Sequence, residues 1–464
     1  MGDQTRARII SQPGRFDARA RRPYLRRMKP LRLTLMALAA ALLCAPALVR
    51  AQDSSIPHAE AAKTFAEMHA ICARDGGRFW GVSLCGPVLF VDPNTRDVVA
   101  NGPDRGGVLK RDGDIWVGHM PASENISNAP MTWSGTAWTE LMWPLPPLSA
   151  DHRHVMMAHE MFHRVQPALG LMRQDNGNAH LDTLEGRYWL ELEYRALAKA
   201  LTAKTDRERR RATLDALDFR AERYRLFPTA AKTERDLEYA EGIPEYTGLH
   251  VGLTSPAARV QAALDDLSDH AKDASFVRTV AYATGPSYGL LLDRYAPSWR
   301  AQLKQNRSFN EILRDALHAP VPADLDARVK VAAARYDGAA LRQSELARED
   351  ARQKRLAGFR ARFVDGPVLY LPMHHASVSF RPVDLQPLDD KGTVYTILRV
   401  SADWGVLEVT GGALLKEDFS GVTVSAAGAG DAPVKGDGWT LALKPGWRVV
   451  AGGRAGDFTV TDKP

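Results

Sequence analysis

The spacing of apolar residues changes along the chain, and this change constrains the fold more than any other feature of the sequence. From Ala150 to Phe363, apolar residues recur at three- and four-residue steps, which is typical of amphipathic helices. After Phe363 they form short runs separated by Gly, Pro and Asp, which is typical of strands and turns. Because the two patterns are segregated, they predict an α+β protein and not alternating β-α-β units.

Five regions follow from these patterns. They are an export signal (1–51), a mixed N-terminal region with strands (52–150), a helical region (151–337), a charged connecting helix (338–363) and a small β-sandwich or barrel-like domain (364–464). Helices are predicted at 53–75, 152–166, 182–204, 206–226, 256–270, 276–296, 298–317 and 324–336. The helix at 206–226 is so heavily charged that we expect it on the surface.

The first 51 residues resemble a targeting segment. A basic stretch at 28–32 precedes an apolar run at 33–49, and Ala51 ends a suitable cleavage site. Arg21 and Arg22 begin a pattern that also fits twin-arginine export, so both export routes stay open, and the initiator is either Met1 or Met28. The apolar run is short for a membrane span, which needs about 20 residues. We therefore expect a periplasmic or secreted protein without a stable span after signal removal.

The formal charge of +6 is concentrated in that leader. Residues 1–52 contain 11 Lys or Arg and 2 Asp or Glu, so the rest of the chain has 50 basic and 53 acidic residues. This balance argues against nucleic acid as a partner. Beyond the leader the chain has two cysteines, Cys72 and Cys85, which we expect to form a disulfide in an oxidising compartment. Two buried thiols or a metal-binding pair are the alternatives.

The sequence HEMFH at residues 159–163 is an HExxH motif. On a helix, His159 and His163 lie on one face, one turn apart, so both imidazoles can bind one metal ion. Glu160 is then placed to take a proton from water at that ion. The neighbouring residues are apolar, which predicts a buried helix whose polar groups need a partner.

A third ligand is offered by Glu241, which begins the run EGIPEY. Together with HExxH, this run resembles the gluzincin metallopeptidases of the peptidase MA-like superfamily, over about residues 130–300. The resemblance implies that Zn²⁺ is bound by His159, His163 and Glu241, with Glu160 as the general base. The chain departs from the family pattern at Ala240, where Asn or Ser is usual, and in the 77 residues between His163 and Glu241.

Two assignments keep alternatives. Glu185 is also followed by Gly and lies nearer His163 in sequence, so it is the rival third ligand. For the residue that stabilises the oxyanion, a role that Tyr or His has in gluzincins, we predict Tyr288, with Tyr246 second. A buried core tyrosine is the alternative explanation for either.

Residues 131–145 are rich in Trp and predict one strand just before the HExxH helix. It is a plausible strip for an extended substrate, although its tryptophans also suit a core or a carbohydrate surface. The sequence therefore predicts an exported zinc metallopeptidase acting on a peptide or protein substrate. The alternatives are a non-catalytic periplasmic binding or scaffold protein, and a zinc hydrolase of non-peptide substrates.

Overall fold

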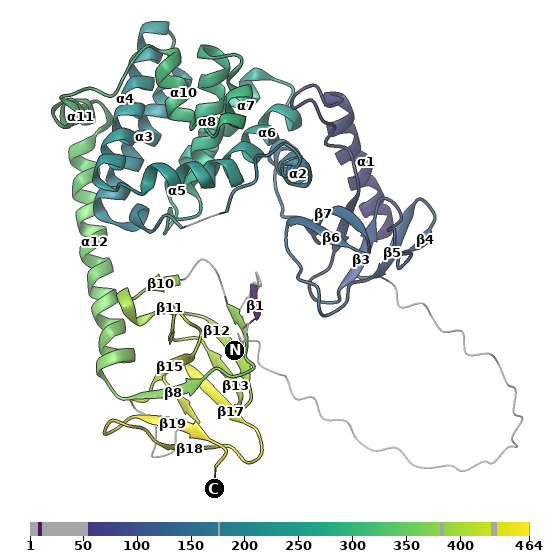
Figure 1. Ribbon diagram of the computed structural model, residues 1–464, viewed down its shortest axis with the longest axis vertical. Coiled ribbons are helices and arrows are strands. Elements are labelled where there is room, and N and C mark those ends of the chain that lie inside the picture. Colours follow the sequence, from purple (N-terminus) through teal and green to yellow (C-terminus); the bar gives the residue numbers. More distant parts are fainter. Residues whose placement is uncertain (1–7, 12–53, 175–176, 381–384, 428–433, 464) are drawn as a thin grey trace, which may run out of the picture. The chain divides into compact units, whose positions relative to one another are not determined.

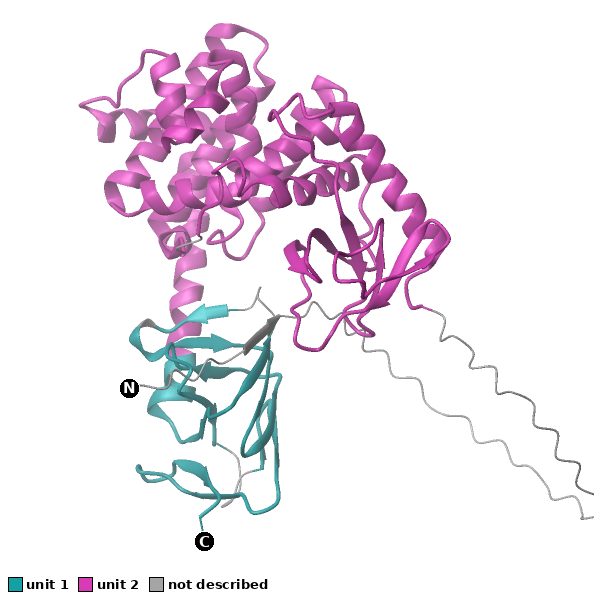
Figure 2. Cartoon of the chain, turned by 45° about the vertical axis from the view of Figure 1, so that its right-hand side comes forward, with its two compact units in different colours: residues 1–53, 359–464 teal, residues 54–358 magenta. Residues whose placement is uncertain are grey.

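The computed structural model describes residues 8–11, 54–174, 177–380, 385–427 and 434–463. The chain is mixed α/β, with a helical middle and a C-terminal β region, as predicted (Figure 1). The predicted export signal, its cleavage site and the two candidate initiators lie outside the described residues. Two compact units are present: residues 54–358, and residues 359–464 together with 1–53 (Figure 2). The boundary at 358 lies inside the predicted connecting helix.

The unit 54–358 begins with helix α1 (His58–Asp75) and a six-stranded sheet. The strand order is β4-β5-β3-β2-β7-β6, and only β2 and β7 pair in parallel within it. The strands are β2 (Val88–Val91), β3 (Asp97–Ala100), β4 (Lys110–Asp112), β5 (Ile115–His119), β6 (Ala129–Trp133) and β7 (Thr136–Met142). The single strand predicted at 131–145 is instead the β6–β7 hairpin, because Ser134 and Gly135 turn the chain with positive φ.

Helices make up the rest of this unit. They include α2 (Ala150–Val165), α3 (Leu184–Thr202), α4 (Asp206–Leu226), α7 (Pro256–His270), α8 (Val280–Tyr295), α11 (Leu325–Ala333) and α12 (Gly338–Arg360), close to the predicted spans. The helix predicted at 298–317 is broken into α9 (Trp299–Gln302), a 3-10 turn and α10 (Phe309–Ala316). Between α4 and α7 lie three elements that the sequence analysis did not predict: α5 (Ala230–Leu237), the π-helical turn η2 (Glu238–Gly242) and α6 (Ile243–Gly252).

One hydrophobic core joins α1, the sheet and the helices of this unit. Phe65 of α1 stacks on Phe90 of β2 with ring centroids 4.5 Å apart. Helix α4 contributes Phe219, Arg220 and Arg223, all fully buried, so its predicted surface location is wrong. Its arginines are buried because carboxylates of α3 and α5 pair with them.

Cys72 and Cys85 form a disulfide, as predicted. The bond links the last turn of α1 to the segment that leads into β2. The loop that it closes packs on two helices: Trp80 donates from its indole to Thr247 of α6, and Arg164 of α2 donates to the carbonyls of Leu84 and Cys85. The disulfide therefore supports the segment that packs on both α2 and α6.

Two sheets form the β unit, in the orders β1-β9-β12-β13-β17-β16 and β10-β11-β14-β15-β8-β19-β18. The strands are β1 (Arg8–Ser11), β8 (Val368–Pro372), β9 (Ser377–Phe380), β10 (Leu385–Pro387), β11 (Thr393–Tyr395), β12 (Leu398–Ala402), β13 (Gly405–Val409), β14 (Ala413–Leu415), β15 (Gly421–Ser425), β16 (Lys435–Gly436), β17 (Trp439–Leu443), β18 (Arg448–Ala451) and β19 (Phe458–Thr461). Both sheets contribute to a separate core around Trp404 and Trp439. None of the described helices has the length and apolar character of a membrane span.

Candidate metal centre

Helix α2 presents both histidines of the HExxH motif on one face. It begins at Ser149, whose side chain accepts a hydrogen bond from the backbone N–H of His152. Met157, Met161 and Phe162 of the same helix are buried in the core. The Nε2 atoms of His159 and His163 consequently face each other at 2.9 Å.

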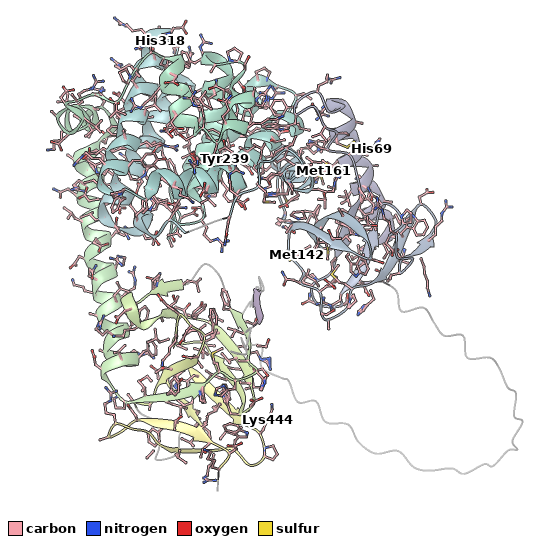
Figure 3. The ribbon with its side chains drawn as sticks, viewed as in Figure 1. His69, Met142, Met161, Tyr239, His318 and Lys444 are labelled. Carbon is pink, nitrogen blue, oxygen red and sulfur yellow. A yellow bond between two sulfur atoms is a disulfide. The ribbon has the colours of Figure 1, made fainter. Side chains whose placement is uncertain are left out.

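Glu241 joins the two imidazoles from the π-helical turn η2, 82 residues after His159 in numbering. Its Oε2 lies 3.5 Å from Nε2 of each histidine. In Figure 3, Met161 marks the motif on α2 and Tyr239 marks the π-helical turn. Glu185, the rival ligand, instead pairs with Arg342 at 2.5 Å and does not belong to this group.

The three ligand atoms have a geometry that a metal ion can bridge. They form a triangle with sides of 2.9, 3.5 and 3.5 Å. An ion about 2.0 Å from each atom fits a triangle of this size, and two imidazoles with one carboxylate are a donor set that suits zinc. A catalytic zinc site has three protein ligands and an open position, so the set is also complete for that role.

A second layer of side chains fixes both imidazole rings. Nδ1 of His159 lies 2.6 Å from Glu245 Oε2, and Nδ1 of His163 lies 2.8 Å from Gln166 Oε1. Gln166 is fully buried and donates from its amide to the carbonyl of Tyr239 at 2.7 Å. It therefore ties the second histidine to the turn that carries Glu241, and both rings keep Nε2 directed at the shared position.

Electrostatics around the trio favour a cation. Burial raises the pKa of Glu160, and its Oε2 has no hydrogen-bond partner among the described residues. For Glu241, burial opposes ionisation, but hydrogen bonds with His159 and His163 outweigh it and hold the pKa far below the usual value. Glu245 adds a third carboxylate beside the two imidazoles. Such an excess of buried acid is stabilised by a bound divalent ion.

The tyrosine closest to this chemistry is Tyr282 on α8. Its hydroxyl donates to Glu241 Oε2 at 2.8 Å, and its ring stacks on His159 with centroids 5.7 Å apart. The two tyrosines proposed from the sequence lie elsewhere. Tyr288 donates to Glu193 Oε1 at 2.7 Å, and Tyr246 donates to Asp293 at 2.6 Å, so neither hydroxyl reaches the trio.

Close helix packing positions the turn that carries Glu241. A Cβ added to Gly285 of α8 would lie 2.3 Å from the carbonyl oxygen of Gly242, so the two backbones touch. Glu238, the first residue of the turn, accepts hydrogen bonds from Arg220 at 2.7 Å and from Thr284 at 2.8 Å. These contacts hold η2 in register with α8, and π-helical turns of this kind recur at functional sites.

Sequence reasoning missed Glu245, Gln166 and Tyr282, although a signal existed for each. Glu245 follows Glu241 by four residues and so shares its helix face. Gln166 follows His163 by three residues, and Tyr282 precedes the predicted Tyr288 by six residues. The spacing of Glu245 could not be used, because the helix at 230–252 was not predicted.

Comparisons with protein-family models, with curated proteins and with solved structures gave no match to this chain. The function of this chain is therefore inferred from the geometry of the site.

Proposed function

We propose that this protein is a zinc-dependent hydrolase that cleaves peptide bonds outside the cytoplasm. The observation that carries the proposal is the group of His159, His163 and Glu241, whose ligand atoms lie within 4.8 Å of one another beside the buried, unpartnered carboxylate of Glu160. A purely structural metal site has no use for this additional acid beside its three ligands. The gluzincin resemblance of the two motifs supports the same class.

In the proposed reaction, the bound zinc would polarise the substrate carbonyl and acidify a water molecule. Glu160 accepts the proton of the attacking water and returns it to the leaving amine. Tyr282 takes the role that the sequence analysis gave to Tyr288: its hydroxyl donates a hydrogen bond to the oxyanion as the carbonyl becomes tetrahedral. Glu245 and Gln166 keep the imidazole rings oriented during these steps.

An extended peptide is the substrate that the neighbouring sheet favours. Strand β6 is the outer strand of its sheet, and no described strand pairs with its free edge. Backbone groups on such an edge can bind an extended chain by β-augmentation. Trp133, Trp138 and Trp143 are buried, so their rings belong to the protein interior and do not form a carbohydrate surface.

Two observations support action outside the cytoplasm. The leader at 1–51 has the composition of an export signal, and Cys72 and Cys85 are joined in a disulfide. Disulfides persist mainly in oxidising compartments.

The test combines metal analysis with one substitution. We expect one zinc per purified chain and cleavage within a mixed peptide library. Glu160→Gln removes the base but none of the three ligands, so it should retain zinc and lose at least about a hundredfold in rate. Full turnover by this variant would contradict the role of Glu160. Zinc without any cleavage by the unaltered protein would favour the binding-protein alternative, and cleavage of esters or epoxides alone would favour non-peptide substrates.

A further inference from the structure

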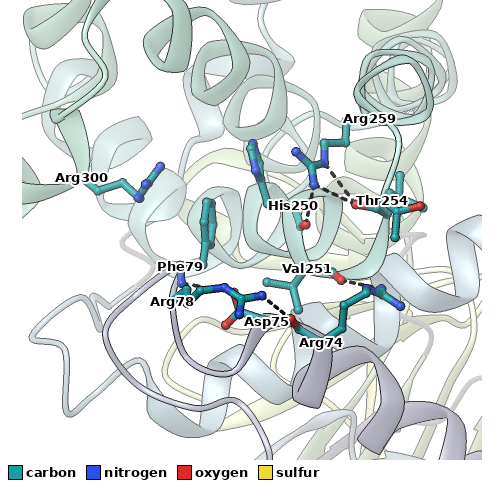
Figure 4. Close-up of a pocket in the computed structure, with 10 residues that line it drawn as sticks. Arg74, Asp75, Arg78, Phe79, His250, Val251, Thr254, Arg259 and Arg300 are labelled. Carbon is teal, nitrogen blue, oxygen red and sulfur yellow. Dashed lines mark hydrogen bonds between the residues drawn. The ribbon is translucent and has the colours of Figure 1, made fainter.

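A cavity of about 390 Å³ lies at the C-terminal end of α6 (Figure 4). Four of its ten lining residues are arginines: Arg74 and Arg78 from the end of α1 and the loop after it, Arg259 from α7, and Arg300 from α9. Asp75 is the single acid in the lining. Its carboxylate accepts hydrogen bonds from the backbone N–H groups of Gly77 and Phe79, within its own loop.

Three of these arginines lack an acidic partner in the described part of the chain. Arg74 and Arg259 donate to backbone carbonyls at residues 250–253, and Arg78 donates to the carbonyl of Arg74. Arg74 and Arg78 are exposed and Arg259 is half-buried, whereas fully buried arginines of the same unit, such as Arg220, pair directly with carboxylates. Because residues 53–464 contain more acidic than basic groups, this concentration of unpaired positive charge is a local feature.

Capping the C-terminal end of α6 uses only some of the hydrogen-bond donors of these arginines. Arg74 and Arg259 satisfy carbonyls that the end of a helix leaves without partners, through Nη2 and Nε. Among the described residues, the Nη1 atoms of both arginines have no hydrogen-bond partner, and Arg78 donates to the carbonyl of Arg74 and not to α6. Burial lowers the pKa of Arg259, as expected for a half-buried cation without an anionic partner. The capping bonds hold the guanidinium groups in place before any ligand arrives.

One wall of the cavity is rigid and aromatic. The ring of Phe79 lies between His250, whose centroid is 4.6 Å away, and the guanidinium of Arg300, 4.3 Å away. Arg300 is held from behind by Tyr246 and Asp293. This wall contributes a fourth cation of fixed orientation next to an apolar surface.

We infer that this cavity is a binding site for an oxyanion of phosphate or carboxylate type, distinct from the metal centre. Guanidinium groups present planar pairs of donors that match the oxygens of such groups, and several of them around one cavity favour a multiply charged ligand. The site lies at the opposite end of α6 from Glu245, and it does not depend on the proposed hydrolysis.

The test is a calorimetric titration. The full chain is titrated with inorganic phosphate and, separately, with succinate at constant ionic strength. Arg78→Gln removes an exposed guanidinium whose one hydrogen bond within the described residues is to the carbonyl of Arg74, so it should leave the fold intact and weaken binding by roughly tenfold. Arg207→Gln, an exposed arginine on α4, is the matched control and should bind as the unaltered protein does.

Titrations are repeated before and after chelation of metal. Equal binding in both states is expected, and preference for phosphate or succinate would identify the ligand chemistry. The inference is overturned if neither anion binds above the ionic-strength background, if Arg78→Gln binds as well as Arg207→Gln, or if binding requires the metal.

Discussion

At the scale of single residues, the two tyrosines on α8 give the sharpest test of the proposed chemistry. Tyr282 donates to Glu241, whereas Tyr288 donates to Glu193 in a buried ion cluster. Tyr282→Phe should lower kcat by about a hundredfold because the oxyanion loses a donor, with zinc content unchanged. Tyr288→Phe should instead lower the free energy of unfolding by about 1–2 kcal/mol and leave kcat unchanged. Peptide hydrolysis rates and thermal melts distinguish them, and the reverse pattern would restore Tyr288 to the site.

Glu140 on β7 gives a prediction for the pH dependence of stability. It is 1% exposed, its Oε1 has no described hydrogen-bond partner, and burial raises its pKa from 4.5 to about 8. The folded chain therefore binds the carboxyl proton of Glu140 more tightly than the unfolded chain does. The protonated carboxyl of Glu140 therefore contributes fully to the free energy of unfolding below pH about 4.5. This contribution is lost as the pH rises toward 8.

Between pH 5 and pH 8 the free energy of unfolding of the unaltered protein should fall by about 3 kcal/mol because of Glu140, and Glu140→Gln should not show this fall. Denaturant melts at the two pH values measure the difference. Asp114→Asn, at an exposed turn of the same sheet, should leave the pH profile unchanged. A parallel profile for Glu140→Gln and the unaltered protein would show that Glu140 ionises normally.

Helix spacing predicted that His159 and His163 share one face, and the gluzincin resemblance added Glu241; the structure brings these three side chains together. The partners that orient these residues were not predictable in the same way. Tyr282 reaches Glu241 only because α8 packs on η2, and that contact depends on tertiary structure.

At the scale of elements, the π-helical turn η2 is the part that the sequence predicted least well. Gly242 and Pro244 in the middle of residues 230–252 weakened the helical signal, yet these residues form a continuous helical run. The charge of α4 was equally misleading: its arginines are buried because Glu193, Glu234 and Glu238 from other elements pair with them. Regular amphipathic elements such as α7, in contrast, matched their predicted span.

The contact between Gly242 and Gly285 should control the position of Glu241. In Gly285→Ala the new Cβ would lie 2.3 Å from the Gly242 carbonyl oxygen, so η2 must move away from α8. We expect about 1–3 kcal/mol of destabilisation and a 10- to 100-fold loss of zinc affinity. Gly358→Ala on α12, where a Cβ meets nothing within 4 Å, is the control and should retain both properties. Competitive zinc titration checks the prediction, and unchanged affinity in Gly285→Ala would contradict it.

At the scale of the whole molecule, the chain has two units that share no hydrophobic cluster: among the described residues, three clusters lie within 54–358 and one lies in the β unit. All three candidate ligands lie in the first unit, so zinc should stabilise that unit alone. Zinc at about a thousand times its Kd adds about 4 kcal/mol to the free energy of unfolding. Chelation should therefore lower the melting temperature of one calorimetric transition by several degrees and leave the other unchanged.

The substitution His163→Ala should reproduce the effect of chelation, and the variant should no longer respond to added zinc. Domain transitions are assigned by following tryptophan fluorescence in single Trp404→Phe and Trp299→Phe variants, because Trp404 is buried in the β unit and Trp299 in the helical unit. If chelation shifted both transitions, or only the β-unit transition, the metal would not reside in the 54–358 core. The proposed assignment of the hydrolase to that unit would then be wrong.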